Sequence, residues 1–214
     1  MPRKTFLIFD YETSGVGESK GVPYSEDECP LPRVNYPVQV AAQYVQYVDE
    51  KFELVSEETH LIKGVERLDP WVLKNCPFLS VKECEREGLT FRESLKKIAD
   101  MISEDDVCTL VAHNIQYDWK EVIVKTVKEL NMESDSSYQR LKNCEQFCTC
   151  VNDIHKQQRS SYYFGRIGKW IGPNLKKLCE THKVDYDESK AHEAMYDVTV
   201  TRQCFEKGFL FLFR

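Results

Sequence analysis

A run of four apolar residues, FLIF, ends at position 9 and is followed directly by two acids, Asp10 and Glu12. A short, wholly apolar run of this kind favours a strand that is buried at the centre of a sheet. Because side chains two apart on a strand share a face, Asp10 and Glu12 should point one way and Tyr11 the other. We therefore expect a sheet built around this strand, with two carboxylates at its end.

Two carboxylates at the end of a buried strand repel each other, which raises their pKa values unless a cation lies between them. Carboxylate oxygens suit Mg²⁺ or Mn²⁺, whereas zinc sites favour His and Cys. The pair Asp10 and Glu12 therefore indicates a divalent-cation site. A D-x-E pair alone is common on acidic strand ends, so the interpretation depends on further residues.

A third acid, Asp118, follows the apolar run CTLVAH and precedes WKEVIVKTVKEL. The first run predicts a strand, and the second predicts a helix that covers the sheet with Val122, Val124, Val127 and Leu130. Asp118 then lies near a helix amino terminus, where the dipole favours an ionised carboxylate. Asn114 lies in the strand-to-helix turn, where capping is its expected role.

The last acidic segment pairs His192 with Asp197. At about 100° per residue, five residues separate these side chains by about 140° around a helix, so they cannot project side by side. We expect Asp197 on the helix and His192 at or just before its start. A His with an unperturbed pKa of about 6.5 can act there as a general base. Without further motifs, an H-x4-D pair on a helix is more often an ordinary surface pair than a catalytic one.

The segments FDYETSG, HNIQYD and HEAMYD resemble, in this order, the three motifs of the DnaQ-like, or DEDDh, class of 3′–5′ exonucleases. The similarity covers nearly the whole chain. YPVQVAAQYVQY and FELVSEETHLIK look like the second and third strands of that fold, and EREGLTFRESLKKIADMI looks like its first helix. The resemblance implies a single α/β domain over residues 1–214, with a ribonuclease H-like mixed sheet flanked by helices. A chain of 214 residues with 42% hydrophobic residues suits one sizeable core.

The resemblance also implies roles for single residues. Four carboxylates would hold two divalent cations, Mg²⁺ or Mn²⁺: Asp10, Glu12, Asp118 and Asp197. Asp10 would be shared by both ions and His192 would activate the attacking water, giving phosphodiester hydrolysis with a nucleoside 5′-monophosphate as product. Thr13 and the backbone after Glu12 would hold the terminal 3′ hydroxyl, with Asn114 as a further substrate-binding candidate.

Two segments depart from that family. Many members carry His-Gly-Ile-Thr before the first helix, whereas this chain reads CPFLS. Phe78 and Leu79 are therefore expected to wedge against a base. The stretch 15–37 is longer than usual and holds four prolines, which predicts a surface loop at the rim of the site.

The formal charge of −6 is unusual for a nucleic-acid-binding protein. Between residues 156 and 177 the sign reverses, because basic and aromatic residues alternate there without any acid. Basic groups can follow phosphates while aromatic rings stack on unpaired bases. We expect Arg166, Lys169 and Trp170 to contact substrate; the alternative is an ordinary loop whose rings pack on the core.

Nine cysteines and no secretory signal predict free thiols and an intracellular location. The close spacing of Cys144, Cys148 and Cys150 leaves a zinc site open, although the C-x2-C pattern is missing. No apolar run approaches the roughly 20 residues that cross a membrane, so a soluble protein is expected. Residues 131–138 are predicted to form a loop. The terminal FLFLF, residues 209–213, should pack on the core, with a dimer contact as the alternative.

The function that the sequence favours is a 3′–5′ exonuclease that acts on single-stranded nucleic acid. DNA is favoured over RNA because YET and HEAMYDVTVT are most similar to the exonuclease I and proofreading branches of the class. The alternatives are an exoribonuclease, an inactive nucleic-acid-binding module of the same fold, and an endonuclease or strand-transfer enzyme. Candidate partners are nucleic-acid 3′ ends and a polymerase or another replication or processing protein. The oligomeric state is open.

Overall fold

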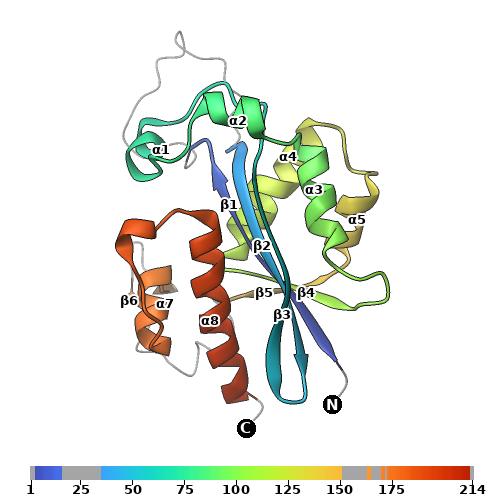
Figure 1. The fold of residues 1–214 in the computed structure, drawn as a ribbon, viewed down its shortest axis with the longest axis vertical. Coiled ribbons are helices and arrows are strands. Elements are labelled where there is room, and N and C mark those ends of the chain that lie inside the picture. The colour runs from blue at the N-terminus through green and yellow to red at the C-terminus, as the bar shows by residue number, and fades with distance from the viewer. Residues whose placement is uncertain (1–2, 16–34, 151–162, 165–169, 172, 213–214) are drawn as a thin grey trace.

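A five-stranded sheet forms the centre of the protein (Figure 1), whose computed structural model describes residues 3–15, 35–150, 163–164, 170–171 and 173–212. The strand order is β3-β2-β1-β4-β5. The bounds of the strands are β1 Lys4–Thr13, β2 Pro37–Val48, β3 Lys51–Leu61, β4 Cys108–Ala112 and β5 Glu145–Cys148. β1, β2 and β3 pair antiparallel, whereas β4 and β5 run parallel to β1. The predicted mixed sheet, with its first strand at the centre, is confirmed.

The alternation of side chains along β1 decides what each face of the sheet carries. Leu7, Phe9 and Tyr11 belong to the larger core cluster, which includes residues of α3 (Phe91–Asp100). Phe6 and Ile8 belong to a second cluster, on the opposite face, with residues of α8 (Ala194–Leu212). By the same alternation, Asp10 and Glu12 share the face that α8 covers, as the sequence predicts.

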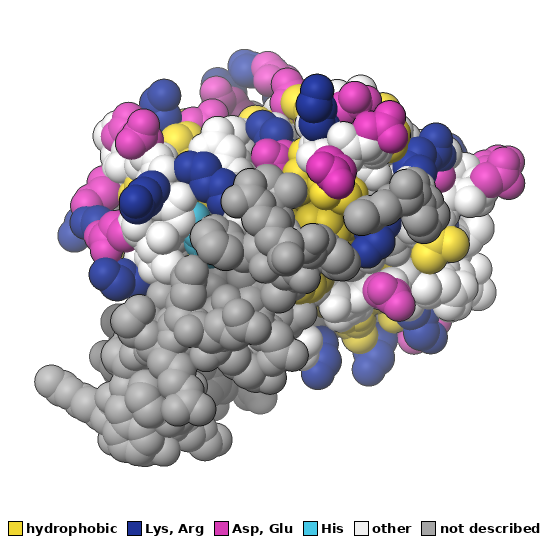
Figure 2. All heavy atoms as spheres, turned by 90° about the horizontal axis from the view of Figure 1, so that it is seen from below, with side chains coloured by type: hydrophobic (Ala, Val, Ile, Leu, Met, Phe, Trp, Pro, Cys, Tyr) yellow, Lys and Arg dark blue, Asp and Glu magenta, His cyan; other side chains and the backbone are white. Residues whose placement is uncertain are grey.

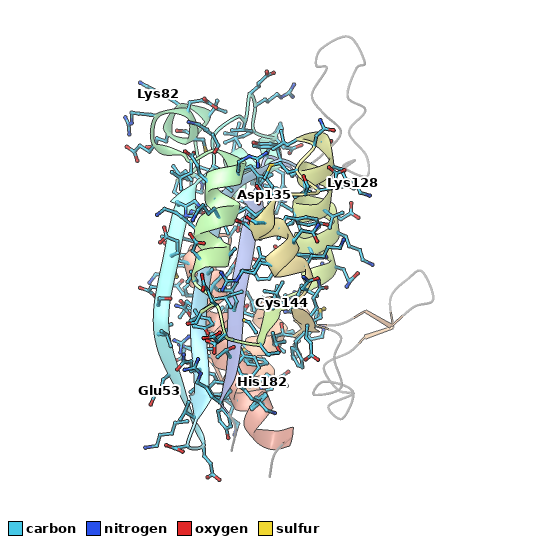
Figure 3. All side chains as sticks on the ribbon, turned by 90° about the vertical axis from the view of Figure 1, so that its right-hand side faces the viewer. Glu53, Lys82, Lys128, Asp135, Cys144 and His182 are labelled. Carbon is cyan, nitrogen blue, oxygen red and sulfur yellow. The ribbon has the colours of Figure 1, made fainter. Side chains whose placement is uncertain are left out.

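The helices form a layer on each face of the sheet, which makes the molecule a three-layer α/β structure (Figure 1). On one side lie α3, α4 (Lys125–Glu129) and α5 (Ser136–Lys142). Figure 3 shows this side, with Asp135 beside α3; its carboxylate pairs with Arg92 at 2.5 Å. On the other side lie α7 (Leu175–His182) and α8.

The segment predicted as the first helix is divided. Glu85–Glu87 end α2 (Val81–Glu87), and α3 begins only at Phe91, behind a capping box between Thr90 and Glu93. Gly88 separates the two helices where the backbone is crowded: a Cβ there would lie 2.3 Å from the Cys84 carbonyl oxygen. A further short helix, α1 (Pro70–Asn75), precedes both, so α3 is not the first helix of the fold.

The helix predicted after Asp118 begins with π-type bonding, as η1 (Tyr117–Val124), and continues as α4. Val122 and Val127 are buried and Val124 is partly buried, whereas Leu130 is 44% exposed and does not cover the sheet. The predicted loop 131–138 is shorter than expected, because Asp135 accepts hydrogen bonds from the first amides of α5. Its last three residues therefore belong to that helix.

The remaining elements are short: β6 (Tyr163–Phe164), β7 (Trp170–Ile171) and the 3-10 turn η3 (Glu188–Lys190). At the carboxyl end, Phe209 is buried and packs edge-on against Phe6, with ring centroids 5.3 Å apart. The start of the terminal apolar run is thus packed on the core, as predicted. Among the described residues, no helix combines the length and the apolar character needed to cross a membrane.

Candidate metal centre and active site

The end of β1 brings the first two predicted acids to the site. Asp10 lies opposite Ala41 of β2 and Glu12 lies opposite Gln39, and the pairing shifts register directly after Glu12. Burial raises the pKa of Asp10 well above its usual range, and the charges of Asp118, Glu12 and Asp197 raise it further. The structure therefore gathers all four acids that the sequence singles out into one electrostatically coupled group.

Asp118 enters the site from the first turn of η1, where it is only 3% exposed. Its Oδ1 accepts a hydrogen bond of 3.1 Å from the backbone N–H of Tyr11, which ties η1 to the end of β1. Burial nevertheless raises the pKa of Asp118 to about 7, even though this hydrogen bond lowers it. The position near a helix start is as predicted, but without a cation the site does not favour ionisation.

Asn114 does not have the capping role predicted from its position. η1 has no side-chain cap. Asn114 instead adopts the left-handed region, with φ of 64°, and its carbonyl accepts a hydrogen bond of 2.8 Å from the amide of Tyr117. Asn is one of the few residues that tolerate this conformation, so Asn114 shapes the turn that delivers Asp118.

Asp197 lies in the first turn of α8 and is 8% exposed. His192 lies two positions before the first helical residue and has a left-handed φ of 68°. The backbone N–H of His192 donates a hydrogen bond of 3.0 Å to Oδ2 of Asp197. This is the arrangement expected from the spacing, with Asp197 on the helix and His192 in front of it.

Three of these residues approach one another closely enough to hold a metal ion. Ligand atoms of Glu12, His192 and Asp197 all lie within 4.8 Å of one another. The Oδ1 atom of Asp197 is buried without a hydrogen-bond partner among the described residues. Burial, followed by the charges of Asp197 and Asp118, raises the pKa of Glu12 to about 8. A divalent cation would supply the missing partner and relieve the repulsion, so the residues present fit such an ion.

Three neighbours of the site residues were not found from the sequence. The indole of Trp71 contacts the imidazole of His192 at a centroid distance of 5.0 Å. The Tyr117 hydroxyl lies 3.0 Å from Oγ1 of Thr13. Burial, together with the charges of Glu12 and Asp197, raises the pKa of the Cys76 thiol to about 12. Only Tyr117 had a visible signal, since it directly precedes Asp118 in the motif.

The predicted substrate contacts have different surroundings. Thr13 is buried, and its hydroxyl already donates to the Gly15 carbonyl at 2.6 Å. Phe78 is 42% exposed and accessible to a base. Leu79 is 3% exposed and belongs to a core cluster with Val72, so its side chain cannot wedge against a base in this arrangement.

The basic and aromatic block falls largely outside the described residues, and so does most of the predicted rim loop 15–37. Arg166 and Lys169 are not described, and of Trp170 only the backbone, in β7, is described. On the face shown in Figure 2, the coloured Lys and Arg side chains are interspersed with Asp and Glu. The described part of that face therefore carries no broad basic patch.

Among the described residues, the closely spaced cysteines do not form the zinc site left open by the sequence. Within the part of the chain that the structure describes, they are not part of any group of three possible metal ligands. Cys148 is buried on the sheet, and the thiol of Cys150 donates to the Pro173 carbonyl at 3.4 Å. The described cysteines are all free thiols.

The sheet order and the helical layers define a ribonuclease H-like fold of the kind found in exonuclease I. No protein-family model and no curated protein sequence matches this chain. Among solved structures, it is similar to Escherichia coli exonuclease I in complex with a dT13 oligonucleotide, with a TM-score of 0.63 and 16% identity over 98% of this chain and 42% of that one.

Two further solved structures show the same likeness. A product-bound exonuclease I has a TM-score of 0.64 and 15% identity, over 98% of this chain and 45% of that chain. The zinc-bound E. coli exonuclease I complex with single-stranded DNA has a TM-score of 0.64 and 16% identity, over 98% of this chain and 42% of that chain. This chain thus spans less than half the length of the exonuclease I chains it matches.

Proposed function

We propose that this protein is a metal-dependent 3′–5′ exonuclease that hydrolyses single-stranded nucleic acid and releases nucleoside 5′-monophosphates. One observation carries the proposal: four carboxylates and a histidine converge at the end of the central strand of an exonuclease I-like fold. A purely structural role does not account for this cluster, because buried like charges destabilise the protein in which they lie.

In this proposal Asp10, Glu12, Asp118 and Asp197 hold two divalent cations, Mg²⁺ or Mn²⁺. When bound, such ions supply Lewis-acid stabilisation of the oxygens that enter and leave the phosphorus. The protein contributes the positions of the ligands. Tyr11 holds the Asp118 carboxylate from β1, and the amide of His192 holds that of Asp197.

His192 is the proposed general base, which takes the proton of the attacking water. Burial lowers the pKa of its imidazole, so the ring is neutral near pH 7 and has a lone pair free to accept a proton. The left-handed turn in front of α8 allows its ring to lie beside Glu12 and Asp197 rather than on the far side of the helix. The backbone after Glu12, with Thr13 and Asn114 nearby, is the proposed site of the terminal 3′ hydroxyl.

Single-stranded DNA is the proposed substrate, with RNA as the alternative. The likeness to exonuclease I structures described with a dT13 oligonucleotide and with single-stranded DNA supports this choice. Phe78 is an exposed ring available to stack on a base. Arg166, Lys169 and Trp170 are proposed to follow the strand farther from the site. Replacing both Lys169 and Trp170 by Ala should weaken single-strand binding without changing the metal dependence of the reaction.

An inactive binding module of this fold is the second candidate. The complete set of carboxylates with His192 argues against it, since nothing would keep such a repulsive cluster in a protein without catalysis. An endonuclease or strand-transfer enzyme on the same architecture is the third candidate. An intracellular location and a polymerase or other processing partner stay predictions of the sequence.

A time course with 5′-labelled linear DNA and RNA of one sequence tests the proposal. Each substrate is incubated with Mg²⁺, with Mn²⁺, with chelator, and with the Asp197→Ala variant. We expect a ladder that shortens from the 3′ end and is lost with chelator and in the variant, and the faster ladder identifies the sugar. A circular single strand is the control, because cutting of the circle would indicate an endonuclease. Binding without any cleavage would favour the inactive module.

A further inference from the structure

Trp71 lies against His192 although nothing in the three acidic motifs includes it. The two rings meet nearly at right angles, 74° between planes, with centroids 5.0 Å apart. This edge-to-face geometry is one of the favoured arrangements of aromatic side chains. The indole is nevertheless 39% exposed, so its packing on the core does not by itself account for its position.

The position of Trp71 is set by the strand that carries the acids. Asp69 caps α1, and its Oδ1 accepts a hydrogen bond of 2.7 Å from the Trp71 amide. The backbone N–H of Asp69 donates to the carbonyl of Ser14 at 2.8 Å, and Ser14 is the first residue after β1, two positions beyond Glu12. Val72, the next residue, is buried in the cluster beneath α1 and holds the helix down. Figure 1 shows α1 above the start of α8, beside the end of β1.

His192 needs an external contact to fix its ring. It lies outside α8 in a left-handed turn, and only its backbone N–H is bound to Asp197. Within the described residues, neither ring nitrogen makes a hydrogen bond, so no carboxylate or carbonyl orients the imidazole in the way a second group orients the base of a catalytic triad. The edge-to-face contact with Trp71 is the ring contact that the structure provides.

We propose that Trp71 is a positioning residue, which orients the imidazole of His192 toward Glu12 and Asp197. It acts through His192 and does not itself touch the reacting atoms. The inference rests on the proposed function for its kinetic consequence, but the geometric part stands independently. It also explains why an indole that is partly exposed lies in the first turn of a short helix whose cap is bonded to Ser14, directly after β1.

Steady-state kinetics on single-stranded DNA test the kinetic part, with Trp71→Leu, Trp71→Phe and the control Leu73→Ala. Leu73 lies on the same helix and is 54% exposed, and it makes no ring contact with His192. We expect Trp71→Leu to lower kcat by about 10- to 100-fold, the range that misplacement of a catalytic group produces, with KM changed by less than about 3-fold. Trp71→Phe should restore most of kcat, because an aromatic ring is retained. Leu73→Ala should match the wild type.

A double-mutant cycle identifies the residue through which Trp71 acts. In a His192→Ala background, Trp71→Leu should cause no further loss, because residues that act as one unit are not additive. An additive loss, or a change confined to KM, would overturn the inference and assign Trp71 to direct substrate contact. If Trp71→Leu does not fold, Trp71→Gln takes its place as the non-aromatic variant, since the indole is 39% exposed. A kcat of Trp71→Gln equal to that of the wild type then overturns the inference.

An NMR measurement separates this inference from the proposed function. The imidazole proton signals of His192 are assigned by their loss in His192→Gln, and the ring current of Trp71 should displace them. We expect Trp71→Leu to move these signals and Leu73→Ala to leave them unchanged. If the wild type degrades no nucleic acid while the signals move, the proposed function fails and the positioning geometry stands. If the signals do not move, the positioning role is wrong whatever the activity.

Discussion

The backbone N–H of His192 donates a hydrogen bond of 3.0 Å to Oδ2 of Asp197, across the turn that leads into α8. This bond explains how two residues five positions apart can serve one site. The carboxylate caps an amide in front of its own helix, and the left-handed φ of 68° at His192 turns the imidazole back toward Glu12. Asp197 therefore has two separable roles, as a charge for cations and as an acceptor that holds the turn.

The two roles of Asp197 can be separated by two substitutions. Asp197→Asn keeps an oxygen that can accept the His192 amide but removes the charge, whereas Asp197→Ala removes both. We expect both variants to lose more than about 100-fold in kcat, because the charge is needed for cation binding. In addition, Asp197→Ala should loosen the turn and speed hydrogen exchange at the His192 amide. Exonuclease assays and amide exchange measure these effects.

The outcome that would contradict this assignment is normal cleavage by Asp197→Asn. Equal exchange rates at the His192 amide in the two variants would leave the charge role intact and remove the structural one. Glu193→Gln is a suitable control, since it changes a neighbouring charge at the start of α8 while leaving Asp197 in place.

Cation binding should stabilise the folded protein by linkage. At about 100 times the dissociation constant, a ligand that binds only the folded state adds about 2.7 kcal/mol. For a domain of this size that is roughly a 5–10 °C rise in Tm. We expect such a rise with Mg²⁺ or Mn²⁺ in the wild type and a much smaller one in Asp10→Asn. Glu121→Gln, a surface change on η1, should behave as the wild type; equal shifts in Asp10→Asn would locate the cation elsewhere.

The stability of the metal-free protein should fall as the pH rises. Burial raises the pKa of Glu12 to about 8, that of Asp118 to about 7 and that of Asp197 to about 6. In the unfolded chain such groups titrate near pH 4, so the folded state binds protons more tightly and loses free energy of unfolding as the pH passes from about 4 to about 8. With chelator present, Tm should decrease across this window.

Two controls make the pH experiment specific. Saturating Mg²⁺ at each pH should flatten the decrease, because the cation neutralises the ionised cluster. Asp118→Asn with chelator should make the decrease shallower, because one of the four carboxylates no longer titrates. A Tm of the metal-free wild type that rises from pH 5 to pH 8 would show that the carboxylates are not held in a repulsive, desolvated cluster.

Local rules were enough to predict the centre of this fold. The alternation along FLIFDYE predicts both the buried strand and the shared face of Asp10 and Glu12, because a period of two leaves no other choice on a strand. The helical angle between His192 and Asp197 predicts that they cannot share one helix face, and the structure indeed has His192 outside α8. Each of these inferences depends only on residues close together in the chain.

Contacts between distant segments could not be predicted in this way. The Trp71–His192 pair joins two segments far apart in sequence, and no periodicity signals it. The break at Gly88 depends on the close approach of the Lys63 backbone, 2.7 Å from where a Cβ would lie. The raised pKa of Asp118 depends on burial that only the packed structure provides. The local sequence pattern predicts which residues have the chemistry for a site. Tertiary packing decides which of them are buried, which are exposed and which neighbours they contact.

Phe78 and Leu79 give the sharpest contrast between packing and substrate contact, because they are adjacent and were predicted to act alike. Leu79 is 3% exposed in a core cluster, so Leu79→Ala should lower the free energy of unfolding by about 2–5 kcal/mol. Phe78 is 42% exposed, so Phe78→Ala should cost less than about 1 kcal/mol. Loss of the Phe78 ring should instead weaken single-strand binding by about 1–3 kcal/mol, the contribution of a ring that stacks on a base.

Denaturant unfolding and fluorescence anisotropy with a labelled oligonucleotide measure the two quantities on the same samples. Unchanged affinity in Phe78→Ala would remove this segment from the substrate path, and an unchanged stability in Leu79→Ala would show that the cluster beneath α1 is not packed as described.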